Sequence, residues 1–234
     1  PGDLTDGPPV HGNMTLEIVW TVIPAVVVMV LSVLAFVVWN TNRTPQPNEN
    51  FVNGQPIDIN VTGARFAWTF EYVTNVEKPL AEGETLAEGQ AAPTVVFRTS
   101  ELHTFLGQNV KLDMVANDVI HSFWVPAMRV KQDLLPGRVT EIRFTPIRVE
   151  GETYPTRYRI VCAELCGGGH GQMYGWLVVH ETEQAYLENF YEQQVFASLN
   201  PPADPVARGE IVLTSGAYAC SNCHVLSSLD WGGI

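Results

Sequence analysis

The chain has 234 residues, of which 46% are hydrophobic and 16% are charged, so it is long enough to fold into one or two domains with their own cores. Its 25 acidic and 13 basic residues give a formal net charge of −12. A negative surface argues against nucleic acid and anionic membrane surfaces as partners, and it fits either a basic partner protein or simple solubility.

An uncharged apolar run, IVWTVIPAVVVMVLSVLAFVVW, occupies residues 18–39. As a helix rising about 1.5 Å per residue it would span roughly 33 Å, enough to cross a bilayer. Trp20 and Trp39 lie near its ends, where interfacial aromatic residues gather. A cleaved signal peptide would have a shorter apolar region with basic residues before it, whereas acidic residues precede this run. We therefore predict a transmembrane helix over residues 17–40 after an extramembrane loop of residues 1–16.

A polar linker is expected over residues 41–56, and the pattern beyond it changes to short runs rich in valine, isoleucine, threonine and aromatic residues. These runs are IDINVTG, FAWTFEY, TVVFRT, VKLDMVA, SFWVP, VTEIRFTP, TRYRIVCAEL and MYGWLVVH. Gly, Pro, Asn and Asp separate them, which is typical of strands joined by turns. We predict an all-β Greek-key sandwich or barrel over residues 57–180, with residues 77–93 as a long exposed excursion.

The sequence becomes helical again after this region, and residues 181–202 are expected to form a helical linker. Its apolar stripe would consist of Ala185, Phe190, Val195 and Phe196. NPPADP (200–205) indicates a domain boundary. Residues 203–234 then predict the start of a second, α-helical domain.

The segment CAELCGGGHGQM (162–173) combines thiol, imidazole and thioether groups. A disulfide would explain Cys162 and Cys166 but neither His170 nor Met173. Structural zinc binds cysteine and histidine but rarely a thioether, while copper accepts all three kinds of ligand. A blue-copper site uses a single cysteine, so this segment has one too many. Two thiolates can instead bridge two coppers, and each copper then needs an imidazole.

His121, in NDVIHSFWVPAMR, is the best candidate for the second imidazole because it lies where one apparent strand ends and the next begins. His103 and His180 are expected to be ordinary surface or strand positions. His11 precedes the apolar run, and His224 belongs to a second motif.

Two of these segments, DVIHSFWVPAMRVKQDLLPGR (118–138) and CAELCGGGHGQM, resemble subunit II of the haem-copper cytochrome c oxidases. LEIVWTVIPAVVV (16–28) is similar to that subunit's second membrane helix, and GARFAWTFEY (63–72) to its aromatic segment. The resemblance covers about residues 14–190. It implies a cupredoxin-like sandwich that carries the dinuclear copper centre called CuA.

Carried over position by position, the resemblance implies that Cys162 and Cys166 bridge the coppers while His121 and His170 bind one copper each. Met173 would be an axial ligand. Glu164 would supply its backbone carbonyl as the other axial ligand and its carboxylate to a magnesium ion at the interface with subunit I.

Three further features follow from the resemblance. Glu17 matches an acid near the mouth of a proton channel, although an acid at a helix start also complements the helix dipole. The family's electron-entry tryptophan falls at Phe66, and Trp68 matches the second tryptophan of that region, so docking of a separate cytochrome c at this point is in doubt. The family has two membrane helices, so we expect the first to precede Pro1.

CSNCH (220–224) has the C-x-x-C-H pattern of covalent haem attachment. Cys220 and Cys223 would form the thioethers, and His224 would bind the iron. A thioredoxin-like pair would need a strand before it, and zinc would need a second pair of ligands further on. The preceding ARGEIVLTSGAYA resembles the first helix of a class I cytochrome c, and we expect the chain to hold only the beginning of that domain.

These features together predict subunit II of a bacterial caa-type cytochrome c oxidase, in which electrons pass from haem c to CuA and then to subunit I. The single Arg43 after the helix would weakly place the following domains inside. Haem attachment outside the cytoplasm overrides it and places them on the periplasmic side of the inner membrane. The donor would be a cytochrome c or a quinol-oxidising complex, the latter in a supercomplex. The alternatives are a membrane-tethered copper and haem carrier outside any oxidase, and a quinol-oxidase subunit that keeps the fold as scaffold.

Overall fold

The computed structural model describes residues 2, 12–76 and 94–214 of the chain. It divides into two compact units, residues 1–45 and 46–234. Each unit is described by itself.

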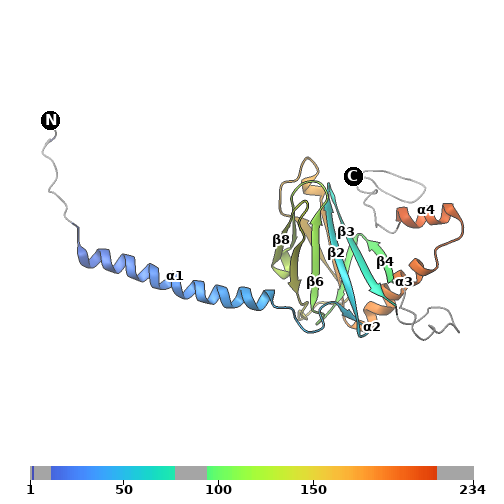
Figure 1. The fold of residues 1–234 in the computed structure, drawn as a ribbon, viewed down its shortest axis with the longest axis horizontal. Helices are drawn as coiled ribbons and strands as arrows, with labels where there is room; N and C mark the ends of the chain where they lie inside the picture. The colour runs from blue at the N-terminus through green and yellow to red at the C-terminus, as the bar shows by residue number, and fades with distance from the viewer. Residues whose placement is uncertain (1, 3–11, 77–93, 215–234) are drawn as a thin grey trace. The chain divides into compact units, whose positions relative to one another are not determined.

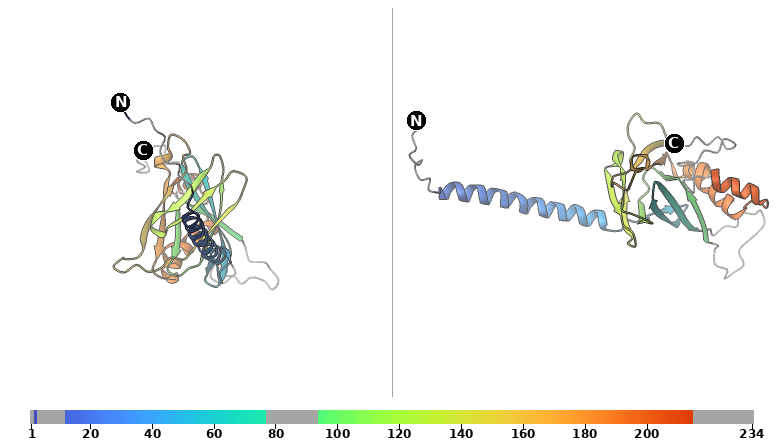
Figure 2. Two further views of the ribbon diagram at one scale, coloured as in Figure 1. Left: turned by 90° about the vertical axis from the view of Figure 1, so that its left-hand side faces the viewer. Right: turned by 90° about the horizontal axis from the view of Figure 1, so that it is seen from above.

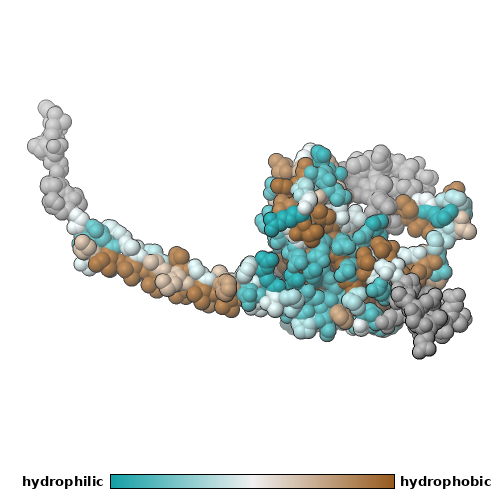
Figure 3. Space-filling model, in the orientation of Figure 1, coloured by the Kyte–Doolittle hydropathy of each residue, from teal (hydrophilic) through white to brown (hydrophobic). Residues whose placement is uncertain are grey.

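The first unit contains one long helix, α1 (Met14–Arg43). It begins where the Asn13 side chain accepts a hydrogen bond from the backbone N–H of Leu16 at 3.2 Å, which satisfies one of the free donors of the first turn. Glu17 in the first turn and Arg43 in the last complement the helix dipole. Apolar side chains are exposed along the helix, as the brown surface in Figure 3 shows. By length and composition α1 can cross a membrane, and it extends three residues beyond the predicted span at each end.

The second unit is a sandwich of two β-sheets (Figures 1 and 2). The first sheet has the order β4-β3-β2-β6-β9, with β1 paired to β2. Its strands are β1 (Phe51–Val52), β2 (Gln55–Ala64), β3 (Ala67–Asn75), β4 (Thr94–Thr99), β6 (Val110–Ala116) and β9 (Thr140–Phe144). The second sheet has the order β5-β11-β10-β7-β8. Its strands are β5 (Glu101–Phe105), β7 (His121–Val125), β8 (Val130–Leu134), β10 (Thr156–Cys162) and β11 (Tyr174–His180).

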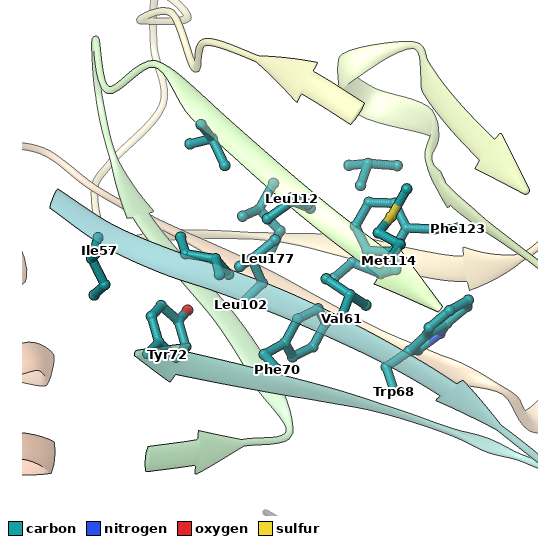
Figure 4. Close-up of a cluster of buried hydrophobic side chains, with 14 of the residues drawn as sticks. Ile57, Val61, Trp68, Phe70, Tyr72, Leu102, Leu112, Met114, Phe123 and Leu177 are labelled. Carbon is teal, nitrogen blue, oxygen red and sulfur yellow. The ribbon is translucent and has the colours of Figure 1, made fainter. Parts of the chain in front are cut away.

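Two strand pairs are parallel, β2 with β6 and β5 with β11, and the other named pairs are antiparallel. Alternate side chains of each strand point between the sheets, as the period of a half-buried strand requires. On β3 these are Trp68, Phe70 and Tyr72, and they form a row along the strand (Figure 4). Together with Leu112 and Leu177 from β6 and β11 they belong to one continuous core. The predicted sandwich is confirmed.

The linker expected over residues 41–56 is shorter in the structure. Helix α1 continues to Arg43, and the hairpin of β1 and β2 begins at Phe51. Asn50 fixes the entry to this hairpin because its buried side chain donates to the carbonyl of Lys111 at 2.7 Å and accepts from the N–H of Lys111 at 2.8 Å. Polar composition suggested a linker without contacts to the sandwich, but the Asn50 side chain makes the pair of hydrogen bonds to Lys111 that a neighbouring strand's backbone would otherwise make.

Up to Thr214, where the described residues end, four helical segments follow the sandwich: α2 (Glu183–Tyr186), the π-helical turn η3 (Leu187–Tyr191), α3 (Glu192–Leu199) and α4 (Pro205–Thr214). The segment from α2 to α3 packs on the sandwich. Phe190 touches Tyr72, Phe97 and His103, so it joins strands of both sheets. Of the predicted apolar stripe, Phe190 and Val195 are buried, Ala185 is half-buried and Phe196 is exposed.

Candidate metal centre

The predicted metal ligands come from three neighbouring parts of the second sheet. His121 is the first residue of β7, and Cys162 is the last residue of β10. These two strands are paired, with Cys162 opposite Phe123. The antiparallel register therefore brings the imidazole and the first thiol to the same end of the sheet.

The other donors lie on the loop between β10 and β11, which we call the ligand loop (residues 163–173). The N–H of Cys162 donates to the carbonyl of Met173 at 3.1 Å and closes the base of this loop. A 3₁₀ turn, η2 (His170–Gln172), ends it. This closure brings Cys166, His170 and Met173 back over the end of the strand that carries Cys162.

The donor atoms converge. The two Sγ atoms are 3.9 Å apart. The Nδ1 atom of His121 lies 3.9 Å from Cys162 Sγ, and the Nδ1 atom of His170 lies 3.6 Å from Cys166 Sγ. The Sδ atom of Met173 is 3.8 Å from Cys166 Sγ, and the Glu164 carbonyl oxygen is 3.2 Å from Cys162 Sγ. The structure thus brings together all six residues that the sequence suggested.

This arrangement fits bridged metal ions. The Sγ separation is too long for a disulfide, whose bond is about 2.05 Å, and both cysteines are free. Two sulfurs that share an ion, each about 2.3 Å from it, can lie up to about 4.6 Å apart. The donor atoms of His121, Cys162 and Cys166 all lie within 4.8 Å of one another. The His170 imidazole lies next to Cys166 Sγ and the His121 imidazole next to Cys162 Sγ, so each imidazole faces a different sulfur.

The centre is largely shielded from water. His121 is fully buried, Met173 is 1% exposed, and both thiols are buried. Burial, together with the neighbouring Cys162, raises the pKa of the Cys166 thiol to about 11. A thiolate here therefore needs a cation beside it, as a bound metal ion would provide.

Asp118 orients the first imidazole, a contact that we did not predict. Its Oδ1 atom accepts a hydrogen bond from His121 Nε2 at 2.8 Å, so Nδ1 is left to face Cys162. Burial disfavours the Asp118 carboxylate, but hydrogen bonds from His121 and from the N–H groups of Arg65 and Val119 outweigh it and hold its pKa well below the usual range. A carboxylate behind a ligating histidine fixes the ring and its tautomer. The spacing of three residues between Asp118 and His121 was the available signal.

The inner side of the centre rests on the other sheet. The Trp68 ring meets His121 edge-on, with centroids 6.2 Å apart, and it meets Phe123 in the same way at 5.6 Å. A Cβ at Gly63 would lie within 3.3 Å of Trp68, Leu134 and His121 atoms. The absence of a side chain at Gly63 therefore allows β2 to approach the imidazole.

Three consecutive glycines, Gly167 to Gly169, predict a slack turn in the ligand loop, and the structure gives two of them specific roles. Gly167 has φ +132°, a conformation that favours glycine. A Cβ at Gly169 would lie 2.4 Å from the ring of Phe66. A Cβ at Gly168, between them, would meet no described atom within 4 Å.

His103 and His180 lie on strands, as expected, but they are not surface positions. The Nδ1 atom of His103 is 3.1 Å from the Nε2 atom of His180, which is 4% exposed. The His103 ring is also close to the Glu101 carboxylate. They form a second histidine cluster apart from the metal ligands, beneath α2 and η3.

The remaining predicted residues are distributed as follows. Glu17 lies in the first turn of α1, and the Glu164 side chain is exposed. Phe66 is half-buried against the ligand loop, and Trp68 is buried. Cys220, Cys223 and His224 lie outside the described residues, and α4 ends at Thr214 before them.

Comparison with known families gives two matches. Residues 57–181 match the family described as cytochrome C oxidase subunit II, periplasmic domain. Residues 2–38 match the family described as cytochrome C oxidase subunit II, transmembrane domain. The second match and the composition of α1 together indicate membrane anchoring with a periplasmic domain.

Curated relatives carry the same name. Cytochrome c oxidase subunit 2 of Synechocystis sp. is 30% identical over 245 residues, covering 88% of this chain and 64% of the relative. The protein of the same name from Thermostichus vulcanus is 32% identical over 228 residues, covering 78% and 62%. That from Alkalihalophilus pseudofirmus is 30% identical over 231 residues, covering 97% and 57%. The chain thus spans about three fifths of the length of these relatives.

Among solved structures, the periplasmic domain of subunit II of cytochrome oxidase (CoxB) of Bradyrhizobium japonicum is 20% identical, with a TM-score of 0.41. The match covers 62% of this chain and 99% of that one. The matched periplasmic-domain family alone accounts for more than half of the 234 residues, so the chain belongs to the cytochrome c oxidase subunit II family.

Proposed function

We propose that this chain is the copper-carrying subunit II of a haem-copper oxidase in a bacterial inner membrane, where it accepts electrons and passes them to subunit I. The observation that carries the proposal is the convergence of two thiols, two imidazoles, a thioether and a carbonyl at one end of the second sheet, where the thiols, the thioether and the His121 imidazole are buried. These are the side chains of His121, Cys162, Cys166, His170 and Met173 and the backbone of Glu164.

Each donor has a distinct part in this proposal. Cys162 and Cys166 would hold the coppers jointly, because their sulfurs lie at a separation that shared ions can span. The Nδ1 atoms of His121 and His170 would each hold one copper, since each faces a different sulfur. Met173 Sδ and the Glu164 carbonyl would complete the donor set. Soft thiolate and thioether ligands with imidazole favour copper.

A dinuclear copper centre supplies reversible one-electron transfer when bound. The protein's part is to keep the ligands still while the charge changes. The hydrogen bond that closes the ligand loop holds Cys162 and Met173 in register, and Asp118 fixes the His121 ring. Buried and packed donors limit rearrangement, and a water-poor site limits solvent reorganisation.

The rest of the electron path is also proposed by resemblance. Electrons pass from a donor, either a cytochrome c or a quinol-oxidising complex in a supercomplex, to haem c attached at Cys220, Cys223 and His224, and from there to the copper centre. Phe66 and Trp68 mark the electron-entry region. Oxygen reduction and proton pumping take place in subunit I.

Two further sites belong to the same proposal. The exposed carboxylate of Glu164 reaches a magnesium ion at the interface with subunit I. Glu17 serves the entry of a proton channel. Membrane lipid surrounds α1, and the sandwich and haem segment face the periplasm.

Copper analysis with electron paramagnetic resonance tests the centre on the purified full chain. We expect two coppers per chain and a seven-line mixed-valence spectrum. Cys166→Ser removes one bridging sulfur and should abolish this spectrum. Cys220→Ser removes a cysteine of the haem motif and should leave it intact. One copper with a blue-type spectrum, or zinc in its place, would contradict the proposal.

The oxidase role is tested separately by affinity purification from membranes in mild detergent. A large multi-helix haem subunit should co-purify with the chain, whereas isolation of the chain alone would favour the membrane-tethered carrier. A pyridine haemochrome assay tests the haem: covalent haem should be present and should be lost in the Cys220→Ser, Cys223→Ser double variant.

A further inference from the structure

A two-residue turn, Arg65 and Phe66, joins β2 to β3 beside the metal centre, with Ala64 and Ala67 paired on either side of it. The backbone N–H of Arg65 donates to Asp118 Oδ2 at 2.8 Å, and its Nε does so at 3.1 Å. The same carboxylate binds His121 through its other oxygen. The turn is therefore fixed to the segment that carries the first imidazole.

The ring of Phe66 lies directly against the ligand loop. A Cβ built on Gly169 would be 2.4 Å from Cδ2, 2.7 Å from Cγ and 2.8 Å from Cε2 of Phe66. A Cβ on Gly167 would be 3.2 Å from Cζ. Three atoms of one ring edge thus occupy the space that a side chain at position 169 would need.

This contact acts on the second imidazole. Gly169 immediately precedes His170, whose N–H donates to the Gly167 carbonyl at 3.1 Å. The Gly169 carbonyl accepts from the N–H of Gln172 at 2.9 Å. The whole turn that carries His170 is therefore built on the two glycines that the Phe66 ring touches. Any displacement of Gly169 moves His170 Nδ1 relative to Cys166 Sγ, now 3.6 Å away.

We propose that Phe66 is a positioning residue of the metal centre. Its ring, held in place by the hydrogen bonds of Arg65 to Asp118, packs against Gly169 and thereby fixes the position of His170. The inference rests on the proposed copper centre and adds a function to a position otherwise associated with electron entry. Arg65 and the His121 imidazole are both hydrogen-bonded to Asp118, so the turn couples the positions of the two imidazoles.

The test is a set of variants of the full chain loaded with copper, compared by absorption and electron paramagnetic resonance spectra and by the rate of copper release to a chelator. Gly169→Ala introduces the clash and should change the spectrum and speed copper release about tenfold, as loss of outer contacts typically does. Gly168→Ala is the matched control in the same loop, because its Cβ meets no described atom within 4 Å. It should match the wild type.

Phe66→Ala removes the ring that packs against Gly169 and should also speed copper release about tenfold. Phe66→Leu keeps an apolar side chain there and should release copper at close to the wild-type rate. The decisive variant is Phe66→Ala combined with Gly169→Ala. With the ring gone the alanine has room, so the double variant should behave like Phe66→Ala alone. Additive effects, or a Gly169→Ala chain identical to wild type, would overturn the inference. A wild-type chain without two coppers would instead refute the proposed function, and the inference with it.

Discussion

Phe190 lies flat against His103, with ring centroids 3.8 Å apart and planes within 3° of each other. The phenylalanine comes from the π-helical turn after the sandwich, and the histidine comes from β5. Phe190 also meets the edges of the Tyr72 and Phe97 rings of the first sheet. One side chain from a segment expected to be a linker thus contributes to the core of the sandwich.

Removing this ring should destabilise the sandwich. Phe190→Ala leaves a cavity among four aromatic rings, the three named above and that of Tyr186, and we expect it to lower the free energy of unfolding by about 3–5 kcal/mol. Phe196→Ala is the control, because Phe196 is 56% exposed on the adjacent α3, and its effect should stay within about 0.5 kcal/mol. Denaturant unfolding of the full chain in detergent, followed by circular dichroism, measures both. Equal effects would contradict the packing role.

The histidine cluster predicts how stability depends on pH. Burial and the nearby His103 lower the pKa of His180 from 6.5 to about 4. Between these values the unfolded chain binds a proton that the folded chain does not, so the free energy of unfolding falls as the pH is lowered from about 6.5 to 4. The loss is at most about 3–4 kcal/mol, and screening of the charge by solvent makes it smaller.

His180→Gln checks this dependence, because glutamine keeps hydrogen-bonding groups but does not titrate in this range. The free energy of unfolding of the variant should depend less steeply on pH between 6.5 and 4. An unchanged slope would mean that other groups dominate acid destabilisation. Glu101 is the main competitor. Its carboxylate pKa is lowered by the hydrogen bond with His103 and by Arg157 against the opposing effect of burial.

Asp118 should contribute to the affinity of the centre for copper. Asp118→Asn keeps the shape of the side chain but removes the charge that faces His121 Nε2, and it weakens the acceptor for Arg65. We expect the copper affinity to fall by about 10–100-fold, measured by competition with a chelator. Asp58→Asn makes the same chemical change at an exposed position of β2 and should leave the affinity unchanged. A similar loss in both variants would point to net charge instead of ring orientation.

A substitution at Met173 can distinguish the packing role of this side chain from its role as a metal ligand. Met173→Leu nearly conserves volume at a fully buried position and should cost less than about 1.5 kcal/mol in stability. It removes the thioether, so copper should be retained while the spectrum and the reduction potential change. Met114→Leu, the same substitution in β6 of the core, should leave the spectrum unaltered. An unchanged spectrum in Met173→Leu would exclude the axial role.

The strands with the clearest alternation, such as β3 and β10, could be predicted from the sequence because their buried faces are apolar. Strand β8 (VKQDL) could not be, since it is a sheet-edge strand with only Leu134 buried. Strand β5 (ELHTF) was missed for another reason: its outward residues Glu101 and His103 are covered by η3 and their polar partners. Composition cannot distinguish such covered polar groups from a loop.

Four of the donor side chains could be proposed from the sequence because their chemistry and spacing are local, and His121 was added as the best candidate from elsewhere in the chain. The Glu164 carbonyl followed only from the family resemblance. The contacts that hold them did not. Asp118 and Phe66 act through the fold, one through a carboxylate behind an imidazole and the other through a ring against a glycine. The glycines illustrate the limit: the sequence indicated conformational freedom, but only the structure shows which one must lack a side chain.

The parallel pairing of β5 with β11 joins residues some 75 positions apart in the chain, and it has a consequence for biogenesis. Within its sheet β5 has β11 as its neighbour, so this strand stays unpaired until residue 180 has been synthesised. The ligand loop lies between β10 and β11, and its base closes only when Met173 reaches Cys162. Capture of metal by the complete set of donors is therefore a late event in the folding of this chain, after both thiols have passed through a stage in which they are accessible.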